Sequence, residues 1–334
     1  MSSVGNVPGE RLQEKVPLWQ TVLQRAMRIR EASLIIFILL ASLVLTLSTP
    51  YFLSADNFLV ILSGISMDAV IAVGMCLVMI SGGIDLSVGS VFACSGVVVA
   101  QLINLGFPVP IAIALALLVA LGWGSLSGFL VTKVGVNPLI STLGVMGMAR
   151  GVVYVITSGR VISNLPDSFK AAGQGNILGI PKLIWVAVFI VILFDFLTRR
   201  SKVLRQLFYV GGSEKAALLS GIHVNRAKMG VYMLCALLAG TAGILETARF
   251  GSASSLAGMG KELTAISACV IGGASLSGGE GSVIGAFLGL ILLGLVRNGL
   301  ILNDVSVYWQ GLIQAIILVL AVAFDVWTRR RRNA

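Results

Sequence analysis

Charged and amide side chains fall inside long apolar runs of this 334-residue sequence, where they could contact a polar solute. Asp68, Arg150 and Arg297 have no oppositely charged residue at helical spacing, so their partners must come from other segments. Asn298 and Gln310 add neutral groups that can exchange hydrogen bonds with hydroxyls. Ionisable residues in such runs are rare, face the interior of a helix bundle and mark functional sites. Two interpretations stay open for each residue: a bond between helices, or contact with a solute.

Two glycine-rich stretches interrupt the apolar sequence in a related way. Both follow the pattern Gly-Gly-x-x-Leu-Ser, one beginning at Gly82 and the other at Gly272. Irregular backbone at membrane depth survives only where it is buried in protein or lines a wet cavity, and interrupted helices often build solute paths. The candidates for a path or a hinge are Gly82, Gly83, Asp85, Ser87, Gly272, Gly273 and Ser275. Asp85 and Ser87 could equally cap the following helix.

The residue types needed for catalysis, metal binding or nucleotide binding do not come together in this sequence. His223 is the only histidine and has no nucleophile or carboxylate constellation around it. The cysteines lie in apolar segments at no metal-ligand spacing: Cys76, Cys94, Cys235 and Cys269. Residues 255–262 lack both the leading glycine and the Ser/Thr of a phosphate-binding loop. We therefore expect no catalytic residue, metal or cofactor in this chain.

The elements that hold these residues are expected to be membrane-spanning helices. The chain is 57% hydrophobic and 11% charged, against about 25% charged in soluble domains. The apolar runs lie near 32–50, 58–81, 86–106, 109–132, 137–158, 182–198, 229–250, 263–279, 282–300 and 307–327. Each run approaches the ~20 residues that cross a bilayer, which predicts an all-α integral membrane protein of about ten spans. Gly-x-x-x-Gly pairs at 124/128, 147/151 and 285/289 predict close helix packing.

Basic clusters predict the orientation of the bundle. They lie at 25–30, 199–205, 226–228 and 329–332, and short basic flanks mark the cytoplasmic side. An even number of spans then places both termini and the 199–228 loop in the cytoplasm, with the 159–181 loop outside. The expected organisation is a tail at 1–31 that is either an amphipathic helix or disordered, a transmembrane domain at 32–327, and a basic tail at 328–334.

The polar island between Tyr209 and Lys228 predicts a docking helix. Ser213 can cap a short helix, Glu214 suits its first turn, and Gly221 ends it after about two turns. Such a helix neither crosses a bilayer nor is stable alone in water, so docking against a partner is its simplest purpose. The candidate coupling residues are Gly212, Ser213, Glu214, Ala216, Ala217, Leu219, Ser220, Gly221 and Ile222.

Together these motifs resemble the permease subunits of bacterial ATP-binding-cassette importers for monosaccharides, of the ribose, xylose, arabinose and galactose type. The run 82–90, the stretch from Glu246 to Ser282, the segment 211–222 and the pattern from Asn298 to Gln310 are similar to that family in the same order. The similarity covers nearly all of residues 30–327. Ser213 stands where relatives often carry Asn, and Glu280 where a basic residue is frequent.

The resemblance implies a bundle in the bacterial cytoplasmic membrane that works with other chains. One partner would be a cytoplasmic ATPase, present as two copies or as one fused chain, which binds the ATP and magnesium. The others would be a periplasmic or extracellular sugar-binding protein and a second copy of the permease or a sister permease. It further implies that residues 212–222 form the coupling helix seated on the ATPase. The sequence leaves three alternatives: a permease for a furanosyl signal, nucleoside or polyol, an ion-coupled secondary carrier, or a membrane enzyme, which lacks a supporting constellation.

Overall fold

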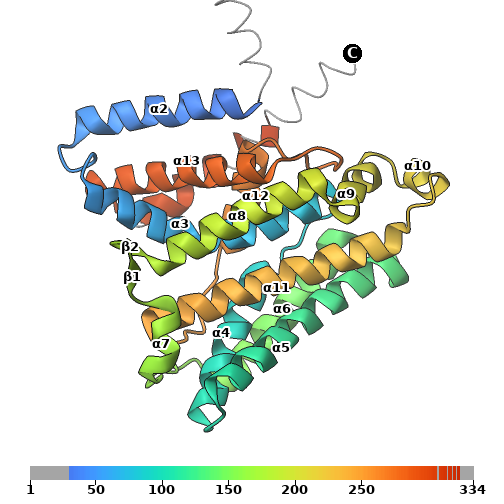
Figure 1. Cartoon of the computed structure of the whole chain (residues 1–334), viewed down its shortest axis with the longest axis horizontal. Coiled ribbons are helices and arrows are strands. Elements are labelled where there is room, and N and C mark those ends of the chain that lie inside the picture. The colour runs from blue at the N-terminus through green and yellow to red at the C-terminus, as the bar shows by residue number, and fades with distance from the viewer. Residues whose placement is uncertain (1–29, 307, 314, 318, 321, 324–334) are drawn as a thin grey trace, which may run out of the picture.

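The computed structural model describes residues 30–306, 308–313, 315–317, 319–320 and 322–323. Apart from Arg30 and Glu31, the expected tail at 1–31 and its amphipathic helix lie outside these residues, as does the expected tail at 328–334. In the described part, every regular element is a helix except one short antiparallel hairpin (Figure 1). The expected all-α architecture is therefore confirmed.

In chain order, the elements are α2 (Arg30–Ser48), α3 (Ala55–Ile80), α4 (Val88–Asn104), α5 (Val109–Phe129), the π-helical turn η1 (Leu130–Val134), α6 (Pro138–Thr157), α7 (Asp167–Gly173), β1 (Asn176–Ile177), β2 (Ile180–Pro181), α8 (Lys182–Arg200), α9 (Lys202–Gly212), α10 (Glu214–Leu219), α11 (Val224–Phe250), α12 (Lys261–Ile271) and α13 (Val283–Leu302). The hairpin β1–β2 pairs Ile177 with Ile180 and connects α7 to α8.

Helix α11 lies at the centre of the bundle and packs against α3, α4 and α5, while α13 packs against α2, α3 and α12 (Figure 1). Small residues let these helices approach closely. A Cβ at Gly124 of α5 would lie 2.6 Å from the Cβ of Ala236 in α11. At Gly289 of α13, a Cβ would lie 2.2 Å from the carbonyl oxygen of Ala268 in α12. Two of the three predicted glycine pairs, 124/128 and 285/289, are thus packing positions.

The third predicted pair, Gly147 and Gly151, lies on an open face of α6. A Cβ at either position, or at Gly144 one turn earlier, would meet no atom within 4 Å. The packing prediction is therefore wrong for this pair within the described chain, because α6 turns these glycines away from the bundle.

Five described helical segments are long and apolar enough to cross a bilayer: α3, the continuous segment Val109–Val134, α6, α11 and α13. The apolar parts of α2 and α4, Ala32–Ser48 and Val88–Asn104, are shorter. The run predicted at 263–279 is helical only as far as Ile271, because the backbone turns at Gly273 with φ 94°. These lengths and compositions describe a multi-pass membrane protein, whereas ten spans remain a prediction.

Candidate functional site

Helix α10 has the capped, self-contained geometry that the sequence predicted. The Ser213 hydroxyl accepts a hydrogen bond from the Ala216 N–H at 3.3 Å, and Gly221 leaves the helix with φ 80°. The Ile222 N–H then closes the helix on the Ala217 carbonyl at 3.0 Å. These two ends satisfy backbone groups that a two-turn helix would otherwise leave without partners.

One face of α10 anchors it and the other projects outward. Ala217 is buried in a small apolar cluster with Val210 and Val224. On the opposite side, 66% of Leu218 and 89% of Leu219 are exposed. Two adjacent leucines left open on a polar loop form a surface that a partner protein could cover.

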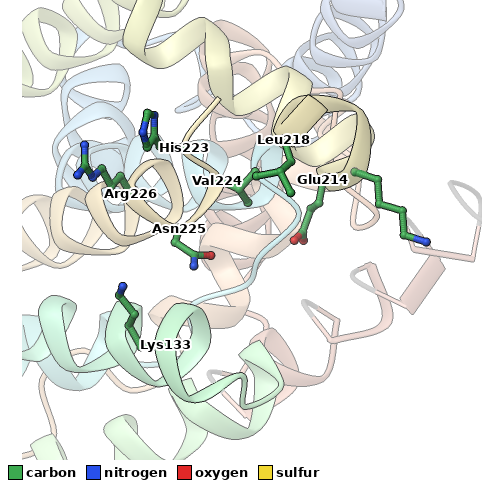
Figure 2. A pocket seen from close by; sticks show the side chains of 8 residues that line it. Lys133, Glu214, Leu218, His223, Val224, Asn225 and Arg226 are labelled. Carbon is green, nitrogen blue, oxygen red and sulfur yellow. The ribbon is translucent and has the colours of Figure 1, made fainter. Parts of the chain in front are cut away.

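Beside α10 lies a hollow of about 540 Å³ whose charged lining residues are three basic and one acidic. It is lined by Lys133, Glu214, Lys215, Leu218, His223, Val224, Asn225 and Arg226. Figure 2 shows Lys133 pointing across this hollow toward the first turn of α11, where Asn225 lies. Glu214 forms an ion pair with Lys228, which ties α10 to α11. The hollow suits an acidic surface of a partner.

The backbones of four glycines meet close to the start of α10, and we call this contact the glycine junction (Gly82, Gly211, Gly278 and Gly279). The Gly279 N–H donates to the Ile80 carbonyl at 2.9 Å, which joins the second glycine-rich break to the end of α3. A Cβ at Gly211 would lie 1.9 Å from that carbonyl oxygen and 2.4 Å from the Gly279 nitrogen. Since α10 begins at Glu214, three residues after Gly211, the contacts of Gly211 join this helix to both breaks.

The two glycine-rich breaks have related local structures, as their shared sequence pattern predicted. Gly82 and Gly273 each leave a helix with positive φ, 81° and 94°. Asp85 Oδ1 accepts a hydrogen bond from the Ser87 N–H at 2.9 Å, and Ser275 Oγ accepts one from the Ser277 N–H at 3.0 Å.

The hydrogen bonds of Asp85 and Ser87 stay within the first break. Ser87 stands at the N-cap position of α4, but its side chain makes no capping bond there. Its hydroxyl donates to Asp85 Oδ1 instead. Asp85 is fully buried, and its Oδ2 accepts no hydrogen bond within the described part of the chain. Both side chains therefore shape the first break rather than cap α4 in the usual way.

The ionisable candidates inside the bundle have different environments. Asp68 of α3 forms an ion pair with Lys261 at the start of α12, and both side chains are mostly buried. Lys261 was not among the predicted site residues, because its partner lies 193 residues away and no local pattern reveals it. The only signal was a lysine close to an apolar run.

Arg150 of α6 fastens a loop to the bundle. Its Nη1 donates to the carbonyl oxygens of Ser255 at 2.8 Å and Ala257 at 2.9 Å, and its Nη2 reaches the Gly89 carbonyl at 3.4 Å. This geometry supports the interpretation as a bond between segments, with backbone carbonyls in place of a carboxylate.

Of the remaining candidates, one joins two helices and the others are exposed or half-buried. Asn298 exchanges two amide hydrogen bonds with Asn57 at the start of α3, at 2.7 and 3.1 Å. Arg297 is exposed on α13, and Gln310 is half-buried. Asn298 therefore joins α13 to α3, whereas the structure does not bring Arg297 or Gln310 to either glycine break. Among the described residues, no group of three or more His, Cys, Asp or Glu has the geometry to hold a metal ion.

Comparison with known proteins places this helical architecture in a family. The family described as "Branched-chain amino acid transport system / permease component" matches residues 57–322, about four-fifths of the chain. The chain belongs to this permease family. The family's description is that of a permease component of a transport system, and together with the relatives below it confirms the resemblance seen in the motifs.

Several curated relatives of the permease are similar over most of its length. It is 40% identical to the ribose import permease protein of Escherichia coli over 305 residues, 90% of this chain and 95% of that protein. It is 38% identical to the ribose import permease protein of Bacillus subtilis, over 85% of this chain and 88% of that protein. It is 36% identical to the L-arabinose transport system permease protein of Escherichia coli, over 80% and 82%. No solved structure matches the chain.

Proposed function

We propose that this permease is the membrane subunit of an ATP-binding-cassette importer for a pentose or hexose. The observation that carries the proposal is the 40% identity to a ribose import permease across 95% of that protein. The similar L-arabinose permease favours the same chemical class over the amino acids in the family's description. We place the protein in the bacterial cytoplasmic membrane, with about ten spans and both termini in the cytoplasm.

Helix α10 is proposed to dock on a separate ATPase that binds ATP and magnesium. Its support is the exposed Leu218–Leu219 pair next to the basic hollow, because apolar and charged complementarity together favour a specific contact. The ATPase would be two copies or one fused chain. A second copy of the permease, or a sister permease, would complete the membrane part, and the open glycine face of α6 is available for helix packing.

We propose that movement of the ATPase reaches the solute path through the glycine junction. The coupling residues 212–222 follow Gly211 without a linker, and Gly211 touches both glycine-rich breaks. A shift of α10 would therefore act directly on the end of α3 and on the loop between α12 and α13. Alternating access needs two packings that are each favoured by different contacts, and close backbone contacts between glycines can separate without rearranging side chains.

The test is reconstitution of the permease in proteoliposomes with its ATPase and its extracellular or periplasmic binding protein. ATP supplied on the ATPase side should drive uptake of labelled ribose or arabinose against a gradient, with ionophores present. Leucine should not compete. Uptake that needs an ion gradient and persists without the ATPase would instead indicate a secondary carrier, and uptake of leucine in preference to sugars would refute the substrate class.

A further inference from the structure

A second hollow, of about 430 Å³, lies at the opposite end of α11 from α10. Its lining is Phe92, Ala93, Glu246, Thr247, Phe250, Ser252, Ala253, Ser254, Leu256, Ala257, Gly258 and Lys261. Glu246 follows Val224 by 22 residues of continuous helix, a distance of about 33 Å and close to the thickness of the hydrocarbon core. If α10 faces the cytoplasm, this hollow lies in the outer half of the bundle.

Four charged side chains in and beside this hollow form two pairs. Asp68 and Glu246 are acidic, and Arg249 and Lys261 are basic. Asp68 pairs with Lys261, and the Arg249 Nη1 lies 3.9 Å from the Glu246 Oε2. Charges that are paired within the protein still offer hydrogen-bonding groups to a neutral solute.

One carboxylate oxygen of Glu246 lacks a hydrogen-bond donor within the described residues. Its Oε2 is buried and accepts no hydrogen bond within the described residues, and a buried polar atom in that state calls for an explanation. The terminal torsion of a glutamate is soft, so the carboxylate can turn an oxygen toward the hollow at little cost. A solute hydroxyl is the kind of donor that this carboxylate lacks.

Phe92 contributes to the apolar back wall of the same hollow, and 2% of this residue is exposed. The Lys261 Nζ lies 5.0 Å from the centroid of its ring, so a cation and an aromatic face stand together at the boundary. Small-molecule sites are concave, about 300–1,000 Å³ in volume, and combine apolar or aromatic walls with a few polar groups. A hydroxyl-bearing ring has both an apolar face and donors to match this wall and Glu246.

We propose that this hollow is a subsite for a neutral polyhydroxyl solute, with Glu246 as the hydroxyl acceptor and Phe92 as the wall for the ring. The subsite receives the solute on the side away from the ATPase. This inference rests on the proposed function, because it takes a monosaccharide as the occupant.

The experiment uses a cysteine placed in the lining and ribose as the probe. Cys76, Cys94, Cys235 and Cys269 are free and buried, so a water-soluble thiol reagent should react slowly with the native permease. Ser252→Cys places a thiol in the lining, and Met259→Cys places one on the same loop outside it. The rate of modification of the purified full chain is measured with and without ribose.

Ribose should slow modification of Ser252→Cys by the factor 1 + [L]/Kd, about tenfold when its concentration is about ten times the half-protecting value. Met259→Cys should not be protected. Adding Glu246→Gln to Ser252→Cys should raise the half-protecting concentration about tenfold, because a bond to a charged acceptor is lost.

The inference is overturned if ribose protects neither cysteine, or both equally, in a permease whose wild-type complex imports ribose. It is also overturned if Glu246→Gln leaves the half-protecting concentration unchanged. Uptake by the wild-type complex is measured in parallel, and failure of that uptake refutes the proposed function rather than the subsite alone.

Discussion

Replacing Gly211 by alanine tests the glycine junction, and Gly212 provides a matched control in the next position. Both glycines end α9, and neither has positive φ, so alanine fits the backbone at both positions. The two sites differ in what a Cβ meets. At Gly211 it would lie 1.9 Å from the Ile80 carbonyl oxygen and 2.4 Å from the Gly279 nitrogen, whereas at Gly212 it would meet nothing within 4 Å.

The expected magnitude follows from these distances. The clashing atoms at Gly211 belong to the backbone, so no side chain can swing away and the ends of α3 and α9 must move apart. Overpacking of this kind costs about 1–3 kcal/mol. The gain from replacing a helical glycine by alanine, up to about 1 kcal/mol, applies to both variants and cancels in their difference. We therefore expect Gly211→Ala to be less stable than Gly212→Ala by about 1–3 kcal/mol.

The measurement is thermal unfolding of each purified variant in the same detergent at one scan rate, since membrane proteins often unfold irreversibly. Soluble domains lose about 2–4 °C per kcal/mol, so a gap of several degrees is expected. ATP-driven uptake by Gly211→Ala should fall as well if the junction transmits motion. Equal melting of the two variants would refute the close contact, and normal uptake by a destabilised Gly211→Ala would refute its role in coupling.

Two further predictions concern the ion pair in the bundle and the exposed leucines. Asp68→Asn leaves the mostly buried Lys261 without its carboxylate and should lower the free energy of unfolding by about 3–5 kcal/mol. Combining Asp68→Asn with Lys261→Met should recover much of that loss. Thermal unfolding of both variants checks this, and an unchanged melting temperature of the single variant would contradict it. Leu219→Glu should abolish co-purification of the ATPase with little change in melting temperature, because Leu219 is 89% exposed. The control is Leu178→Glu in the β1–β2 turn, which is 88% exposed and should retain the ATPase. Equal binding by both variants would argue against α10 as the docking helix.

The sequence predicted the parts of this fold that depend on local chemistry. Ser213 and Gly221 end α10 as capping rules require, and both Gly-Gly patterns mark turns of positive φ. Helical character along the chain followed from apolar runs, but the exact number of spans did not, because a run such as 263–279 can contain a break. Periodicity describes one helix at a time and says nothing about which helices touch.

The long-range contacts therefore had to come from the structure. Lys261 forms an ion pair with Asp68 of another helix, and Gly211 contacts two segments that are far away in the sequence. Arg297 shows the opposite case, because its position in an apolar run suggested an interior side chain and the structure exposes it on α13.

The hydrogen bonds of Arg150 have a consequence for communication across the membrane plane. A single guanidinium grips the loop at the carbonyls of Ser255 and Ala257, while α6, which carries it, presents its open glycine face on the outside of the bundle. A neighbour that displaces α6 from that face would also displace this loop, because Arg150 joins the two. If a second permease packs on that face, as proposed, its movement would shift the loop beside the proposed subsite without passing through the core of the bundle.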